Sequence, residues 1–389
     1  MTVATRPLKV ERNLPDPTRS LNRLYWTVLA AVFAGSLIFF LYTWWLSLER
    51  PRGNYTGFFG WYDQSQYLAI ARDLASGHLP SREAYTYGLG YPLVAVPSLL
   101  IGFPREPFMP FNALAFGASI TMVAAVGARL RSLRFGILCA GALMLASPLL
   151  ALTVVPWSST ITLIAVAAAL LVATSERPGW GSAIVIGIAI GACFAARYVD
   201  ALFPMVIGIA GLARNPRRII GRIALTSLVA AIFIVPVLVS HWLILGSPFT
   251  TPYASHLGLG NVGSSDQDLG SYNLLAVPGR TIGSFVSALQ NHQRWPGDPL
   301  LALFPWVLAA PMGLWFLLKE RHRLVTPVAT AFTVSVIGTI FYMAFRASGA
   351  SQLQHGLLHY FKAWFVIWGL LAAYGIARLL DRLQSGLAA

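Results

Sequence analysis

Ten apolar runs of 16 to 23 residues follow one another along this chain of 389 residues. A helix needs about 20 apolar residues to cross the hydrocarbon core of a bilayer, and it satisfies its own backbone polar groups there. Only 11% of the residues are charged, against about 25% in soluble domains. The sequence therefore predicts an all-α integral membrane protein with about ten transmembrane helices, at 24–46, 108–128, 135–153, 158–174, 181–196, 198–213, 223–244, 299–318, 324–345 and 360–380.

Basic residues predict the orientation of this bundle, because Lys and Arg concentrate in cytoplasmic loops. With a cytoplasmic N-terminus, the inner segments hold 18 of the 28 basic residues and 5 of the 14 acidic residues. The outer segments hold the remaining 10 basic and 9 acidic residues. The net charge of +14 is thus mostly a topology signal rather than a sign of a nucleic-acid partner. We expect a multi-pass protein of the cytoplasmic membrane with both termini inside.

The predicted organisation is one membrane domain at 24–380, between cytoplasmic tails at 1–23 and 381–389. The first apolar run is too long for a signal-peptide core and lacks a small-residue cleavage site, so we expect a retained signal anchor. Two long loops, 47–107 and 245–298, fall on the outer side, and the functional surface is expected there.

The first outer loop is expected to contain interfacial helices. Its apolar residues Tyr67, Ile70, Ala71 and Leu74 recur at the spacing of one helix face. A helix that lies along the membrane surface fits this pattern. The shorter apolar piece 91–103 predicts a second interfacial or re-entrant helix.

Asp63 lies in the most polar stretch of this loop, and two interpretations of it are open. A carboxylate beside apolar and aromatic neighbours can act as a general base toward an acceptor hydroxyl. The sequence Asp63-Gln64-Ser65-Gln66 also matches a capping box, in which Asp63 caps the helix and Gln66 returns the bond. The two roles are compatible.

Arg197-Tyr198-Val199-Asp200 interrupts an otherwise apolar run. Two spans of about 16 residues are each about 24 Å long, so the turn between them is expected slightly below the outer interface. An Arg at that depth costs about 2–3 kcal/mol unless it is paired or hydrated. Two partners are open for Arg197: Asp200, or a lipid phosphate that the guanidinium grips with two parallel bonds.

Four more cations surround the outer loop between the last two spans: Arg346, His355, His359 and Lys362. They are candidates to bind an anionic head group together with Arg197. Lys362 lies near the start of the final span and is equally explained as a residue that snorkels to the interface.

Patterns that suggest a cofactor or a metal are weak in this chain, and neither is predicted. Gly258-Leu259-Gly260-Asn261-Val262-Gly263 matches a dinucleotide-binding pattern but lacks the strand–turn–helix context. Asp266 and Asp268 lie in a Gly/Ser-rich stretch, where a solvated turn explains them. The His residues lack zinc-ligand spacing in a predicted helix.

Three tyrosines with two glycines between them close the polar stretch. Aromatic residues at a membrane boundary are ordinary belt residues, yet flat faces and hydroxyls also suit a sugar. Glycines allow close approach of the backbone. The residues are Tyr85, Tyr87 and Tyr91, with Gly88 and Gly90.

Three segments together resemble a known superfamily. They read Tyr62-Asp63-Gln64-x-Gln66-Tyr67-Leu68, Tyr87-Gly88-Leu89-Gly90-Tyr91-Pro92-Leu93, and Gly246-Ser247-Pro248-Phe249 with Tyr253 shortly after. With the cytoplasmic N-terminus and the single span before the first of them, they resemble GT-C glycosyltransferases. Within that superfamily the layout is similar to protein O-mannosyltransferases and the lipid A aminoarabinose transferase, which implies a GT-C-like bundle.

The resemblance implies transfer of a sugar, with inversion, from a polyprenyl-phosphate donor to a hydroxyl of a glycan, lipid or protein at the outer face. Asp63 takes the role of base, and the five cations above bind the donor phosphate. Many members carry a pair of acids in this loop, whereas Tyr and Gln flank Asp63 here, which favours a metal-independent mechanism. The expected substrate contacts are Gln64, Gln66, Tyr67, Tyr85, Tyr87, Tyr91, Tyr198, Asp200, Tyr253 and His256.

Two functions of other classes stay open. A secondary transporter or lipid flippase would place Arg197 and Asp200 along a substrate path, although such sites usually lie near the bilayer midplane. A non-catalytic assembly subunit would use its loops to bind partners. Convergence of the polar groups on one outer site favours the enzyme.

Overall fold

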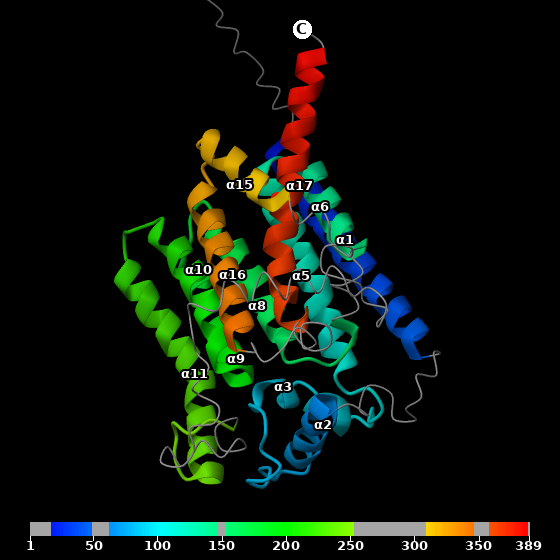
Figure 1. The fold of residues 1–389 in the computed structure, drawn as a ribbon, viewed down its shortest axis with the longest axis vertical. Helices are drawn as coiled ribbons and strands as arrows, with labels where there is room; N and C mark the ends of the chain where they lie inside the picture. The colour runs from blue at the N-terminus through cyan, green and yellow to red at the C-terminus, as the bar shows by residue number, and fades with distance from the viewer. Residues whose placement is uncertain (1–16, 49–61, 146–152, 253–308, 346–357, 388–389) are drawn as a thin grey trace, which may run out of the picture.

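The computed structural model describes residues 17–48, 62–145, 153–252, 309–345 and 358–387, and every regular element in these ranges is helical. Longer helices run beside one another as a bundle, and short helices gather at one end of it (Figure 1). The bundle contains α1 (Pro17–Leu48), α5 (Met109–Leu130), α6 (Leu133–Leu145), α8 (Ser159–Ala173), α9 (Trp180–Ala196), α10 (Leu202–Ala213), α11 (Ile219–Leu245), α15 (Ala310–Lys319), α16 (Val325–Phe345) and α17 (Leu358–Leu387).

Each of the ten predicted spans overlaps one of these helices within the described residues. The run 299–318 is helical from Ala310 onward, and the run 135–153 is helical as far as Leu145; residues 299–308 and 146–152 lie outside the described residues. Four described helices are long and apolar enough to cross a membrane, and the other apolar helices are shorter. The four are Asn22–Leu46, Met109–Leu130, Ile219–Leu245 and Lys362–Ser385. The α-helical membrane class is therefore supported, while the count of ten spans stays a prediction.

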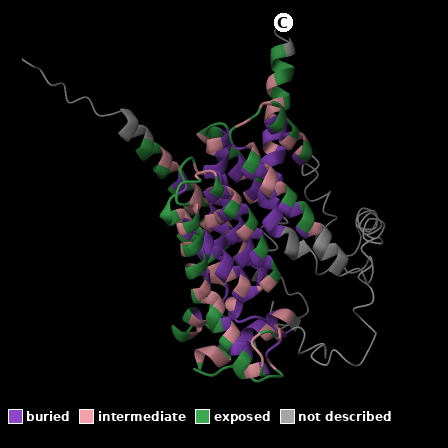
Figure 2. Ribbon diagram, turned by 90° about the vertical axis from the view of Figure 1, so that its left-hand side faces the viewer, coloured by how far each residue is buried: buried purple, intermediate pink, exposed green. Residues whose placement is uncertain are grey.

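The distribution of apolar surface fits a lipid environment. Only 17% of the apolar window of α1 and 22% of that of α11 is buried inside the protein, against 67% for α5 and α17. On α11, Ile220, Leu228 and Ile232 are each more than 60% exposed. Figure 2 shows buried residues along the inside of the bundle and exposed ones on its outside. Outward-facing apolar side chains along long helices are stable in contact with lipid hydrocarbon, whereas contact with water disfavours them.

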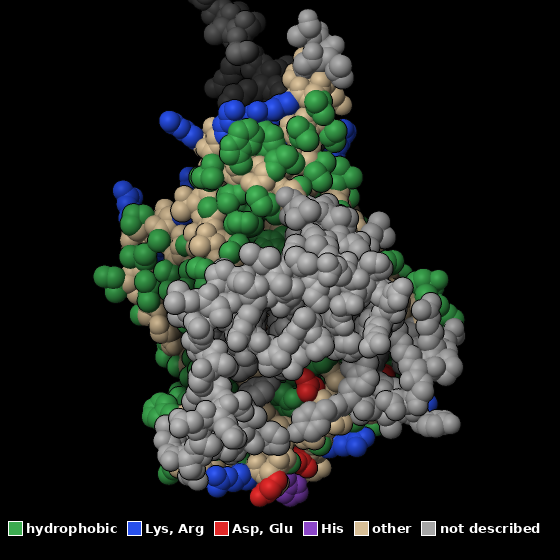
Figure 3. Space-filling model, viewed as in Figure 1, with side chains coloured by type: hydrophobic (Ala, Val, Ile, Leu, Met, Phe, Trp, Pro, Cys, Tyr) green, Lys and Arg blue, Asp and Glu red, His purple; other side chains and the backbone are tan. Residues whose placement is uncertain are grey.

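The two ends of the bundle differ in character. The turns from α5 to α6, from α10 to α11 and from α15 to α16 lie at the end opposite α2 (Tyr62–Ala75) and α3 (Gly90–Leu93) (Figure 1). Arg residues occupy each of these turns, and Lys and Arg side chains line the upper rim in Figure 3. This arrangement agrees with the charge bias of the sequence, and the orientation in a membrane stays a prediction.

The helix predicted from the apolar spacing of residues 67–74 is present as α2, and its position at the outer membrane surface stays a prediction. Tyr67, Ile70 and Ala71 are buried, as the apolar spacing predicts, and Leu74 packs against the same core. The face that they form packs within the protein, against α3 and α4 (Val96–Leu100). The predicted short apolar helix at 91–103 is divided between α3 and α4.

Candidate functional site

Asp63 lies in the first turn of α2, where its carboxylate meets the loop that follows. The Tyr87 hydroxyl donates a hydrogen bond of 2.5 Å to Asp63 Oδ1. The Asp63 side chain is partly exposed, whereas Tyr87 is 8% exposed. A short bond from a phenol to a carboxylate is a charge-assisted one, so Tyr87 holds the carboxylate in place while leaving it accessible.

The capping-box interpretation of Asp63 differs from what the structure shows. Helix α2 already begins at Tyr62, so Asp63 follows the first helical residue instead of preceding it. The hydrogen bond of its carboxylate joins it to Tyr87, 24 residues on in the chain. This bond fixes Asp63 against the tyrosine-containing segment.

Gln64 and Tyr67 attach α2 to the start of α8. Gln64 Nε2 donates to the Pro156 carbonyl at 3.0 Å, and its side chain is fully buried. The Tyr67 hydroxyl donates to Ser158 Oγ at 3.2 Å. The two side chains lie three residues apart and therefore on one face of the helix. The Asp63 helix is thus anchored directly at the N-terminus of α8.

The tyrosine-containing segment packs on the end of α9. A Cβ at Gly88 would lie 2.6 Å from the Ala195 carbonyl oxygen, and one at Gly90 would lie 2.6 Å from the Ala196 nitrogen. The close backbone approach predicted from Gly88 and Gly90 is present, and it brings this segment against α9. The segment that carries Tyr87 therefore lies directly beside the turn that begins at Arg197.

Arg197 lies between α9 and the 3-10 helix η2 (Tyr198–Ala201), beside a buried carboxylate. Its guanidinium is 3.4 Å from Asp200 Oδ2, and the side chains are 15% and 2% exposed. Asp200 also accepts a short hydrogen bond from the Thr162 hydroxyl of α8. The local partner expected for Arg197 is thus present, and Thr162 ties the pair to the same helix that receives α2.

Lys362 is fully buried in the first part of α17 and joins this cluster. Its ammonium donates to Thr160 Oγ1 at 2.6 Å and lies close enough to Arg197 for their charges to interact. The interpretation of Lys362 as a residue that snorkels to the interface does not fit this burial. We call Arg197, Asp200, Lys362, Thr160 and Thr162 the cation cluster.

The start of α8 is the common support of both groups. Ser158 binds the Asp63 helix, Thr160 binds Lys362, and Thr162 binds Asp200. These three positions, from 158 to 162, span about 6 Å along a helix axis. Segments far apart in the chain, 63–67, 197–200 and 362, therefore meet at one end of the bundle, as a converging site requires.

A second chain of contacts leads from the turn that contains Tyr198 to α11. The Pro248 carbonyl can only accept, so His241 Nδ1, 3.2 Å away, carries a proton. In the neutral ring Nε2 then accepts from the Tyr198 hydroxyl, at 2.8 Å. The Tyr85 ring lies 5.8 Å from the His241 ring. Burial raises the pKa of Tyr85 to about 12, so its phenol stays protonated.

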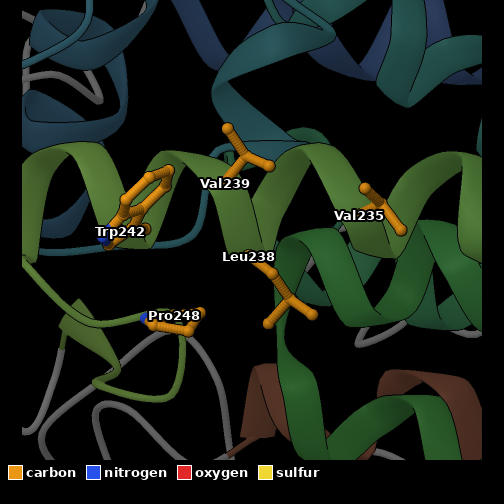
Figure 4. Close-up of a pocket in the computed structure, with 5 residues that line it drawn as sticks. All are labelled: Val235, Leu238, Val239, Trp242 and Pro248. Atoms are coloured by element: carbon orange, nitrogen blue, oxygen red, sulfur yellow. The ribbon is translucent and has the colours of Figure 1, made fainter.

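An apolar groove of about 240 Å³ runs along the second half of α11. Val235, Leu238, Val239 and Trp242 line it from the helix, and Pro248 lines it from the segment that follows (Figure 4). Its lining is hydrocarbon in character, which suits an acyl or isoprenoid segment. Pro248 links the groove to Tyr198 through His241.

The remaining predicted substrate residues have mixed placements. Tyr67 and Tyr91 are buried in an aromatic cluster, and the Tyr91 hydroxyl donates to Asn112 Oδ1 at 3.1 Å. Gln66 is partly exposed on α2. His359 lies in the first turn of α17, but its side chain is outside the described residues, and so are Arg346, His355, Tyr253, His256, Asp266 and Asp268.

Several residues of the site escape sequence reasoning. Thr160 and Thr162 are ordinary side chains in an apolar run, and nothing local marks them. His241 does carry a signal, because an ionisable residue inside an apolar run is a candidate for function by default. Glu106 is 8% exposed at the entrance to α5, where burial alone raises its pKa to about 7.

The described residues contain no group of three or more His, Cys, Asp or Glu side chains placed to hold a metal ion. The chain matches no known protein family, no curated protein and no solved structure in the three comparisons made.

Proposed function

We propose that this protein is an integral-membrane glycosyltransferase, which moves a sugar from a polyprenyl-phosphate donor to an acceptor hydroxyl at the outer face. The observation that carries the proposal is the convergence of the Asp63 helix and the cation cluster on the start of α8. A partly exposed carboxylate and a buried cation cluster at one end of a lipid-facing bundle are the two parts that this chemistry requires.

Asp63 is the base in this scheme. The acceptor oxygen attacks the anomeric carbon and forms the new glycosidic bond, while its proton passes to the Asp63 carboxylate. Tyr87 holds Oδ1, which leaves Oδ2 to take the proton. The bond from the anomeric carbon to the phosphate oxygen breaks, and its electron pair leaves with the lipid phosphate. Attack opposite the leaving group inverts the anomeric centre.

Arg197 is the donor-facing cation, because its side chain keeps 15% of its surface exposed whereas Lys362 has none. A phosphate that approaches Arg197 competes with Asp200 for the guanidinium. The Lys362 amine lies behind Arg197, and the phosphate of a bound donor favours its charged form, which stabilises the charge that develops on the departing phosphate. The apolar groove on α11 is the proposed path for part of the carrier chain, since Pro248 and His241 join it to Tyr198, next to Arg197.

The base assignment is tested by Asp63→Asn, with Asp73→Asn on the same helix as the matched control. Transfer from a panel of synthetic polyprenyl-phosphate sugars is followed with purified protein. Loss of a general base typically costs 10²- to 10⁴-fold in rate, so we expect at least a hundredfold loss for Asp63→Asn and little change for Asp73→Asn. An Asp63→Asn protein that folds normally and transfers sugar at the wild-type rate contradicts the assignment.

The phosphate role of the cation cluster is tested by Arg197→Lys and Lys362→Met. Arg197→Lys keeps the charge opposite Asp200 but loses the two-pronged grip, and Lys362→Met keeps the length of the side chain without its charge. Each loses an interaction of the charge-assisted class, worth about 1.5–3 kcal/mol, so donor affinity should fall about 10- to 150-fold. Arg72→Gln, exposed on α2, is the control.

Unchanged donor affinity in both cluster variants removes the phosphate role. Movement of an intact lipid-phosphate sugar across a liposome membrane, with no transfer to any acceptor, favours the flippase instead.

A further inference from the structure

The opposite end of the bundle carries a second feature, at the corner where α15 meets α17. The two helices touch backbone to backbone there: a Cβ at Gly313 would lie 1.9 Å from the Leu371 carbonyl oxygen, and one at Gly375 would lie 2.7 Å from the Gly313 nitrogen. This crossing brings the end of α15 against the last turns of α17. Trp315 and Phe316 of α15 consequently face Arg382 of α17.

Two cations lie against one exposed indole ring at this corner. Lys319 Nζ is 4.9 Å from the centre of the Trp315 ring, and Arg382 Cζ is 5.7 Å from it. Arg382 also lies 4.6 Å from the centre of the Phe316 ring. Cation–π contacts of this length hold each charge in place without neutralising it.

The neighbouring carboxylates are engaged by other groups. Glu320 Oε1 accepts from the Arg378 guanidinium, and Oε2 accepts from the Tyr374 hydroxyl. Asp381 pairs with Arg131 and Arg378. Within the described ranges, neither Lys319 nor Arg382 forms an ion pair with any carboxylate. Both cations are thus available to an external anion.

The surface around the two cations is apolar. Trp315 is 49% exposed, Leu318 54% and Leu383 53%. In Figure 3 blue side chains lie directly above hydrophobic surface at this upper end. A ligand that fits this corner must therefore combine a negative head group with hydrocarbon. A free anion would leave the apolar surface without a partner. The leaflet that basic loops face is also the one richer in anionic lipid.

We infer that the α15–α17 corner, formed by Trp315, Lys319 and Arg382, is a binding site for an anionic phospholipid. The head-group phosphate lies between Lys319 and Arg382, and the acyl chains run along Trp315 and the exposed leucines. This site is at the other end of the bundle from the cation cluster, and it is independent of the proposed transfer reaction.

The test uses full-length protein in mixed micelles with equal amounts of phosphatidylglycerol and phosphatidylcholine, and native mass spectrometry counts the lipids retained. Wild-type protein should retain phosphatidylglycerol in preference to phosphatidylcholine. The double variant Lys319→Gln/Arg382→Gln should lose that preference about thirtyfold, since each basic residue near anionic lipid contributes about 1 kcal/mol, which is about fivefold. Arg217→Gln/Arg323→Gln, which removes two exposed charges at the same end, should keep it.

Two further variants separate the site from general effects. The charge swap Lys319→Arg/Arg382→Lys should retain the lipid preference. Trp315→Leu should weaken that preference although all charges stay in place. These two variants keep the test decisive if the double Gln variant does not fold. Equal losses in the two double Gln variants, no preference in the wild-type protein, or displacement of the lipid by soluble glycerophosphate would each overturn the proposal.

Discussion

Two carboxyl groups between α1 and α5 show how surroundings decide the role of a residue. Asp63 is partly exposed and accepts a hydrogen bond from Tyr87. Glu106 is 8% exposed, and desolvation raises its pKa to about 7. Sequence reasoning finds Asp63 because it lies in a polar stretch. Glu106 stands between Arg105 and Pro107 in an ordinary loop, and its burial is visible only in three dimensions.

Glu106 should make the stability of the protein fall with rising pH. Its pKa is about 7 in the folded state and about 4.5 in the unfolded chain. Below about pH 4.5 both states hold the proton and the group has no effect. Between that pH and about 7 the unfolded state ionises first, so the free energy of unfolding decreases, by about 3 kcal/mol in total.

Replacing Glu106 by Gln should remove this decrease and raise the thermal unfolding temperature above pH 7. Thermal unfolding in detergent from pH 5 to 8 measures it. Glu83→Gln, an exposed carboxyl of the same loop, should give no such gain above pH 7. A Glu106→Gln protein with the wild-type pH profile would show that Glu106 is solvated.

At the scale of elements, the contact between the segment that carries Tyr87 and α9 brings the two halves of the candidate site together. Gly88 and Gly90 let the loop backbone rest on Ala195 and Ala196. This contact places Tyr87, and through it Asp63, beside the Arg197 turn. The contacts of α2 with Pro156 and Ser158 hold the other side of the loop. The loop is therefore braced between α8 and α9.

Gly90→Ala should disturb this brace. Its new Cβ would lie 2.6 Å from backbone atoms of Ala195 and Ala196, and backbone cannot move aside as a flexible side chain can. Overpacking of this kind costs about 1–3 kcal/mol. We expect a lower unfolding temperature in detergent together with reduced transfer activity.

Gly181→Ala, in α9 with open space around its Cβ, is the matched control. It should be neutral or stabilising by up to about 1 kcal/mol, because alanine favours a helix. Equal unfolding temperatures for Gly90→Ala and Gly181→Ala would mean that the loop does not depend on its contact with α9.

At the scale of the whole molecule, alternation of the helices places the α2 end and the basic end on opposite sides of the bundle (Figure 1). The proposed transfer site and the proposed lipid site therefore face different leaflets. In a membrane with basic loops inside, Ser81 of the first outer loop should lie outside and Ser385 of α17 inside. Both are exposed.

Single cysteines at these two positions test the orientation. A membrane-impermeant maleimide should label Ser81→Cys in intact cells and Ser385→Cys only after permeabilisation. The native thiols, Cys139 and Cys193, are buried and should give little background. Labelling of Ser385→Cys in intact cells would reverse the proposed orientation.

The sequence by itself determined the helices of this protein. Within the described residues every predicted apolar run overlaps a helix, because a chain in hydrocarbon must satisfy its backbone internally and the length of each run shows where that requirement applies. The apolar spacing from Tyr67 to Ala71 likewise determined the buried face of α2.

Only the tertiary structure decided which side chains meet. Asp63 pairs with Tyr87 instead of capping its own helix, and Lys362 reaches Thr160, 202 positions away in the chain. Such partners depend on which helices are neighbours and how closely they approach, which small residues such as Gly90 and Gly313 allow. Helix formation is local and readable from periodicity, whereas packing joins residues that no local pattern relates.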